Sequence, residues 1–137
     1  MSEYEHDFYA WTQAQAAALR AKDWAALDLE HVAEEIESMG KRDRRAVEST
    51  LVVRLGHGLK WVYQPARRSG SWRRTLTVSR PRLARILRDH HTLRAELADL
   101  IPVAYADARE LAATETGLPL ATFPETCPWR PEQVAWS

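Results

Sequence analysis

The sequence predicts an all-α protein: a compact bundle of about five helices, followed by an extended, proline-rich C-terminal strap. Apolar residues recur at intervals of three and four along most of the chain, which gathers them on one face of a helix. No stretch alternates apolar and polar residues as a half-buried strand does. Four of the seven prolines fall in residues 118–137, so this strap cannot be a long helix.

Length and composition indicate a single helical domain over residues 1–137, because a chain of this length can bury a real hydrophobic core. No apolar run approaches the roughly 18 residues of a transmembrane helix, so we expect no membrane contact. The acidic N-terminus lacks the apolar centre of a signal peptide. Cys127 is the only cysteine, which excludes an intrachain disulfide and fits the reducing cytoplasm.

The net charge of zero hides a segregation along the chain. Residues 1–40 carry nine acids and two bases, residues 41–94 carry fifteen bases and three acids, and residues 95–137 carry seven acids and two bases. The three segments therefore have formal charges of −7, +12 and −5. A block this basic suggests phosphate binding. The alternative, which the overall neutrality favours, is that acidic outer helices pack against the basic middle.

The first half of the chain is expected to form three helices. Asp7 and Asp28 are the expected N-caps, since their carboxylates can accept free backbone N–H groups of a first turn. Gly40 is expected to end the helix that begins after Asp28, in the left-handed conformation. A mostly apolar helix then runs from Lys41 to the proline at position 65. The helix after Asp28 has an apolar face made of Leu29, Val32, Ala33, Ile36 and Met39.

The second half is expected to form two long helices and the strap. Ser71 is the expected cap of the first, and Pro81 should break it, kink it or open a new helix. Thr92 is the expected cap of the second, which Pro102 should kink or divide and Gly117 should end. The residues expected to pin the strap are Phe123, Trp129 and Trp136.

No motif assigns a chemistry to the chain. A Walker loop, a dinucleotide fingerprint, a nucleophile elbow, a zinc knuckle and an HExxH pair are all absent from the sequence. His90 and His91 are adjacent, but no acid and histidine spacing elsewhere completes a metal ligand set. We therefore expect neither a metal nor a cofactor.

Six stretches carry a family resemblance, and they follow one another in order over nearly the whole chain. They are DFYAW, LDLEHVAEEIESMG, HGLKWVYQP, RRSGSW, YADARELAATETGL and FPETCPW. In these stretches the chain resembles the bacterial family catalogued as domain of unknown function number twenty-nine. The resemblance implies a small, all-helical bacterial protein, and it implies no activity.

Nine polar residues, most of them in those stretches, form a candidate cluster. They are Glu34, Glu35, Glu37, Arg54, His57, Lys60, Arg68, Tyr105 and Arg109. The favoured interpretation is a buried network of ion pairs and hydrogen bonds that fixes helix register, because these cations and carboxylates can satisfy one another. The alternative is a catalytic or ligand site, in which Glu35 or Glu37 acts with His57 and the cations hold an anion.

A second candidate set is rich in arginine and resembles a nucleic-acid-binding face, with one tryptophan as a stacking surface. It contains Arg67, Arg68, Trp72, Arg73, Arg74, Arg80, Arg82, Arg85 and Arg88. The alternative is a solvated helix face whose arginine stems cover apolar surface.

Three functions remain, in decreasing order of support. The first is a protein-binding or regulatory module, including a homodimer, with tryptophans as interface anchors. The second is nucleic-acid or phosphate binding through residues 67–88. The third is an enzyme with a Glu/His site between helices, against which the missing catalytic signature counts.

Overall fold

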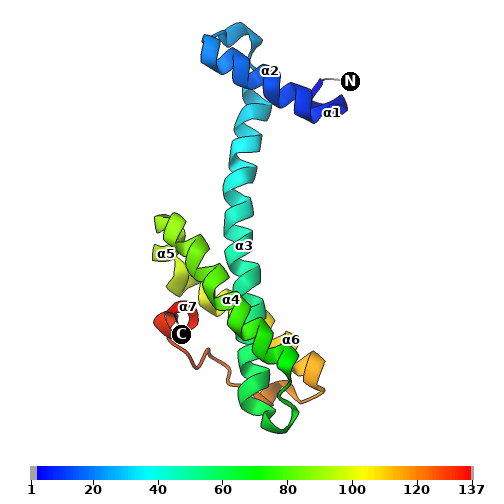
Figure 1. The fold of residues 1–137 in the computed structure, drawn as a ribbon, viewed down its shortest axis with the longest axis vertical. Helices are drawn as coiled ribbons and strands as arrows, with labels where there is room; N and C mark the ends of the chain where they lie inside the picture. The colour runs from blue at the N-terminus through cyan, green and yellow to red at the C-terminus, as the bar shows by residue number, and fades with distance from the viewer. Residues whose placement is uncertain (1–2, 137) are drawn as a thin grey trace. The chain divides into compact units, whose positions relative to one another are not determined.

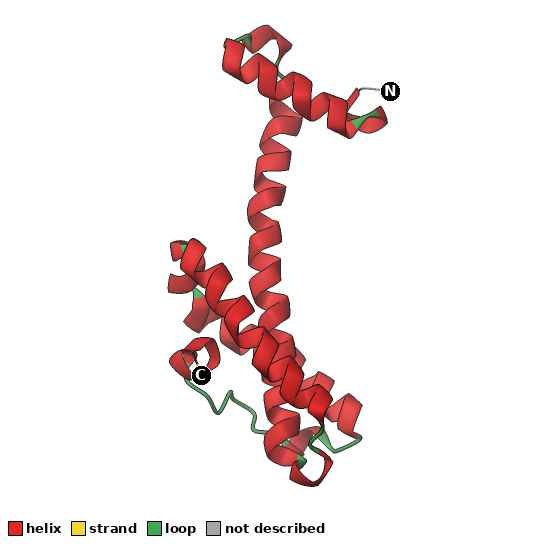
Figure 2. Cartoon of the chain, in the orientation of Figure 1, coloured by secondary structure: helices red, strands yellow, loops and turns green. Residues whose placement is uncertain are grey.

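The computed structural model describes residues 3–136, and every regular element in that range is a helix (Figure 2). This confirms the predicted all-helical class. Contacts between residues divide the chain into two compact units, one up to Arg42 and one from Asp43 onward. A single domain over the whole chain therefore stays a prediction. No helix within residues 3–136 combines the length and the apolar character needed to cross a membrane.

The first unit contains three helices and the beginning of a fourth (Figure 1). Its elements are α1 (Glu3–His6), α2 (Phe8–Ala21), the 3-10 helix η1 (Trp24–Ala26) and the first turns of α3 (Leu29–Tyr63). Asp7 caps α2 as predicted, since its Oδ1 accepts the Ala10 N–H at 3.0 Å. Asp28 caps α3 as predicted, and its Oδ1 accepts the His31 N–H at 3.4 Å.

Helix α3 corrects the prediction that a helix ends at Gly40. The helix runs without a break from Leu29 to Tyr63, and Gly40 does not have the positive φ of a left-handed cap. A glycine inside a helix costs only about 1 kcal/mol relative to alanine. The residues around it, Met39, Lys41 and Arg42, favour the helix strongly enough to offset that cost.

The second unit is built around the C-terminal part of α3, which α4 crosses in Figure 1. Its further elements are η2 (Pro65–Arg67), α4 (Gly70–Asp89), α5 (His91–Ala95), α6 (Leu97–Thr116), η3 (Leu120–Thr122) and α7 (Pro131–Trp136). Leucines of α3 and α4 and alanines of α6 form its core, and the small alanine side chains allow α6 to approach closely. Among the fully buried side chains are Val47, Leu51, Leu55, Leu59, Leu83, Leu87, Ala108 and Phe123.

The boundaries of α4 differ from those predicted. Ser69, not Ser71, is the cap, because its backbone is extended and its Oγ accepts the Trp72 N–H at 3.2 Å. Pro81 lies inside α4 and does not break it. The helix continues on both sides because its leucines are held in the core.

The last long helix is divided, but not at Pro102. The division falls at Glu96, between α5 and α6, and Pro102 lies inside α6. Thr92 lies inside α5 and is not its cap. Gly117 ends α6 as predicted, with a left-handed φ of 72°.

The C-terminal strap contains two short helices, η3 and α7, so it is only partly extended. Phe123 is buried in the core of the second unit and Trp129 packs against that core, as predicted. The side chain of Trp136 lies outside the described part of the chain.

Candidate functional site

Arg54 joins three helices of the second unit. Its side chain is buried on α3, where Nε donates to the Val134 carbonyl of α7 at 2.5 Å and Nη1 donates to the Leu76 carbonyl of α4 at 3.1 Å. Burial, and then the charge of Arg80, lower the pKa of Arg54. Arg54 is thus satisfied by backbone carbonyls and not by a carboxylate, which explains how the fold tolerates a buried cation.

Lys60 forms the shortest ion pair among residues 3–136, and its partner, Glu115, was not among the predicted carboxylates. Its buried Nζ lies 2.5 Å from Oε2 of Glu115 and 5.1 Å from the centre of the Trp72 ring. Trp72 therefore already has a cation beside its ring, and its role as a stacking surface stays a prediction. Glu115 lies two residues before Gly117, inside the stretch YADARELAATETGL that carries the family resemblance. Its position in that stretch is the sequence feature that could have identified it as a partner.

Tyr105 and Arg109 bind the strap. The Tyr105 hydroxyl donates to the Pro124 carbonyl at 2.6 Å, and Nε and Nη2 of Arg109 both donate to the Phe123 carbonyl at 3.1 and 3.0 Å. Burial raises the pKa of Tyr105 to about 12. The phenol therefore remains a donor at neutral pH, and both side chains hold α6 against the strap.

His57 and Arg68 contact the backbone of α3. His57 Nδ1 lies 3.0 Å from the Val53 carbonyl, and burial lowers the pKa of this imidazole. Arg68 Nε donates to the Trp61 carbonyl at 2.8 Å, while its guanidinium lies 4.6 Å from the centre of the Trp61 ring. The polar residues predicted for one site therefore have separate partners within the second unit.

The three predicted carboxylates belong to the first unit. Glu35 Oε1 accepts the Tyr4 hydroxyl at 2.5 Å, and this hydrogen bond is the main cause that raises the pKa of Tyr4 to about 12. The side chains of Glu34 and Glu37 are exposed and make no hydrogen bond or ion pair with another described residue. The acid and base work of Glu35 or Glu37 with His57 therefore stays a prediction.

A cluster around His31 holds the first unit together, and sequence reasoning did not select it. His31 Nδ1 lies 2.6 Å from Asp28 Oδ2, and the same oxygen accepts the Trp11 Nε1–H at 3.4 Å. The Tyr4 ring stacks on the His31 ring with centres 4.0 Å apart. The hydrogen bond with Asp28 raises the pKa of His31 and lowers that of Asp28. The cluster fixes where α3 begins.

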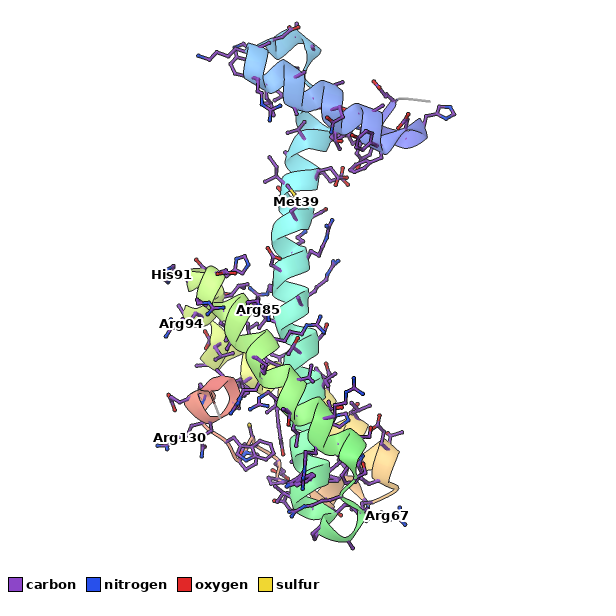
Figure 3. All side chains as sticks on the ribbon, in the orientation of Figure 1. Met39, Arg67, Arg85, His91, Arg94 and Arg130 are labelled. Carbon is purple, nitrogen blue, oxygen red and sulfur yellow. The ribbon has the colours of Figure 1, made fainter. Side chains whose placement is uncertain are left out.

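The arginines of α4 show whether ion pairs within the chain neutralise its basic segment. Arg73 lies 5.7 Å from the Trp61 ring centre, but no carboxylate within residues 3–136 pairs with the arginines at positions 74, 80, 82, 85 or 88. All are exposed, and Arg67 and Arg85 are labelled in Figure 3. Neutralisation by direct ion pairs occurs elsewhere, since Arg44 binds both Glu48 and Glu96. The basic face of α4 is thus left without acidic partners among the described residues.

A groove runs beside that face, between α3 and α4. It encloses about 350 Å³. Its lining residues are Ser49, Thr50, Val53, Arg74, Thr75, Val78, Ser79 and Arg82. The charged lining is entirely cationic, and both valines are exposed. This groove suits an acidic partner with an apolar centre.

The first unit has an unusual balance of buried and exposed side chains. Only Trp11 and Ala18 are buried among its described residues. Seven large apolar side chains remain exposed: Phe8, Tyr9, Leu19, Trp24, Leu29, Ile36 and Met39. Met39 is labelled in Figure 3. The apolar residues predicted to share one face of α3 are therefore largely exposed, and within the first unit few side chains pack against them.

These features define an all-helical protein whose polar side chains bind its own backbone and whose first unit is short of a core. No group of three side chains suited to metal binding occurs among residues 3–136. The family model for the domain of unknown function DUF29 matches residues 3–136, so the chain belongs to this family, as the resemblance implied. No curated protein and no solved structure matches the chain.

Proposed function

We propose that the chain is a protein-binding module, in which the apolar surface of the first unit docks on another protein chain. One observation carries the proposal: the first unit buries two apolar side chains and exposes seven large ones. Exposed apolar residues concentrated in this way mark an interaction surface. Trp24 and Tyr9 add aromatic anchors, the side chains most often central to protein interfaces.

The size of the first unit supports the same conclusion. Folding units below about 40 residues usually need a disulfide, a metal or an oligomeric partner to be stable, and the first unit, which ends at Arg42, is close to that size. The sole cysteine, Cys127, belongs to the second unit, and no metal-binding group occurs among the described residues. These observations support a partner chain as the source of apolar burial for this unit.

The docking surface is the apolar stripe of α3 within the first unit. Leu29, Val32, Ile36 and Met39 follow one another at steps of three, four and three, which is the spacing of a helix-pairing seam. Leu29, Ile36 and Met39 are 67%, 58% and 52% exposed. The acids beside this stripe favour a partner that offers cations around an apolar centre.

Site-specific photocrosslinking tests this proposal. A photoreactive residue at position 36 should capture a protein that the same residue at position 103 does not. Val103 is the matched control because it is 68% exposed but belongs to the second unit. The captured protein, once purified, should bind the wild-type chain and lose most of its affinity for Ile36→Glu. Equal crosslinking from both positions, or unchanged binding by Ile36→Glu, would contradict the proposal.

A further inference from the structure

We propose that the partner is a second copy of this chain, and that the stripe of α3 in each copy docks into the groove between α3 and α4 of the other. This inference rests on the proposed function and names its partner. It accounts for two surfaces that the monomer leaves uncovered: an acidic, apolar one on the first unit and a basic, partly apolar one on the second.

Charge supplies the first argument. The chain is neutral overall, yet its first 40 residues have a formal charge of −7 and residues 41–94 one of +12. Direct ion pairs within the described residues do not cancel this difference at α4. A neutral chain with two separated surfaces of opposite charge is complementary to another copy of itself.

The spacing of the charged residues supplies the second argument. On the first unit, Glu30 and Glu37 lie seven residues apart on α3, which is a rise of about 10.5 Å. On the second unit, Arg74 and Arg82 lie eight residues apart on α4, a rise of about 12 Å. Along its axis, α3 therefore presents two negative charges at nearly the same separation as the two positive charges of α4.

The residues between those charges supply the third argument. Ala33 lies between the two glutamates on the same face of α3, beside the exposed Ile36. Val78 lies between the two arginines at steps of four, and it lines the groove together with Val53. Docking would bury these apolar side chains against one another, with an ion pair at each end.

Arginine also suits the proposed pairing with glutamates of a second copy better than lysine does. The basic residues from 67 to 88 are all arginines, and a guanidinium can bind a carboxylate through two parallel hydrogen bonds. The same geometry fits the phosphates of nucleic acid. Nucleic acid would, however, use none of the exposed apolar residues of the first unit and would leave its negative charge unanswered.

The test is the solution mass of the full chain, measured by analytical ultracentrifugation over a range of concentrations. We expect a dimer of twice 15.7 kDa that dissociates as salt is raised. Glu30→Arg/Glu37→Arg and Arg74→Glu/Arg82→Glu should each raise the dimer Kd by about a hundredfold, because like charges then face each other. An equimolar mixture of the two variants should dimerise again, since both contacts regain opposite charges.

Two controls accompany these variants. Arg88→Glu makes the same charge change on α4 outside the groove, and it should leave the dimer intact. Circular dichroism of each variant should match the wild type, and recovery on mixing shows independently that both variants are folded.

Three results would overturn the inference. They are a wild-type monomer at all concentrations, a dimer insensitive to both charge reversals, and no recovery on mixing. A monomer that binds a 20-base-pair DNA duplex or a single-stranded RNA, and loses that binding in Arg74→Glu/Arg82→Glu, would assign the groove to phosphates. If the chain is monomeric but position 36 still crosslinks specifically to another protein, the proposed function stands and only the second copy is excluded.

Discussion

Replacing Gly40 with alanine tests the continuity of α3, because a helical glycine and a left-handed cap predict stability changes of opposite sign. Gly40 is helical, and a Cβ added there would meet no atom within 4 Å. The substitution removes only the conformational cost of glycine, so unfolding should become about 1 kcal/mol less favourable. A left-handed cap at Gly40 would instead make alanine destabilising by a similar amount.

The same variant measures how the two units cooperate. Unfolding entropy is about 2.1 cal/mol/K per residue, so about 1 kcal/mol raises Tm by roughly 3 °C if all 137 residues unfold together. If the 42 residues up to Arg42 unfold separately, the shift in their own transition is roughly 10 °C. Thermal unfolding followed by circular dichroism at 222 nm separates these cases. The smaller shift in a single transition would support the predicted single domain.

Gly117→Ala is the matched control. Gly117 has a φ of 72°, so alanine there is strained and stability should fall by about 1 kcal/mol. If Gly40→Ala lowers the free energy of unfolding as Gly117→Ala does, α3 is not continuous through Gly40 and our account of this helix is wrong.

Three further predictions follow from contacts within single units. Arg54→Leu should cost about 2–5 kcal/mol in urea unfolding, because one buried and one partly buried carbonyl lose their donor; a cost below about 0.5 kcal/mol would contradict this. Gly58→Ala should not stabilise the protein as Gly40→Ala does, because its Cβ would lie 3.0 Å from the Trp129 ring and this contact offsets the gain of about 1 kcal/mol from helix propensity; a gain equal to that of Gly40→Ala would contradict this. The hydrogen bond with Asp28 raises the pKa of His31, so its stabilisation should be present below pH 6.5 and disappear as pH rises through the raised pKa. The stability difference between wild type and His31→Asn should therefore shrink as pH rises, and a growing difference would refute the assignment.

The sequence predicted those parts of the fold that depend on neighbouring residues. Asp7 and Asp28 act as caps because a cap needs only the first turn that follows it. Gly117 ends α6 for the same local reason. Gly40 shows the limit of such signals: a glycine permits a left-handed cap, but the helix preferences on both sides decide whether one forms.

Pairing between distant residues could not be predicted in the same way. Arg54 binds a carbonyl 80 positions away, and Lys60 binds Glu115 across 55 positions. Residue type showed that both cations would need partners, but many carboxylates and carbonyls were available to each. Choosing among them requires the packing of α6 and the strap, which a sequence pattern does not contain.

Periodicity has a further limit at the proposed docking surface. The repeat of Leu29, Ile36 and Met39 correctly shows which face of α3 is apolar. It does not show what covers that face, because the same pattern serves a core, a dimer seam or a partner's groove. Their exposure in the structure supports the proposal that another chain covers them.

Amide hydrogen exchange of the full chain, at low and at high protein concentration, tests the central claim most directly. If the first unit depends on a second chain for burial, amides of α2 and of α3 before Arg42 should exchange much faster than core amides of α6 in the dilute protein. Protection of those first-unit amides should then rise with concentration, while α6 stays unchanged. First-unit amides that are as protected as those of α6 in the dilute protein would show that this unit is stable alone, and would contradict the account.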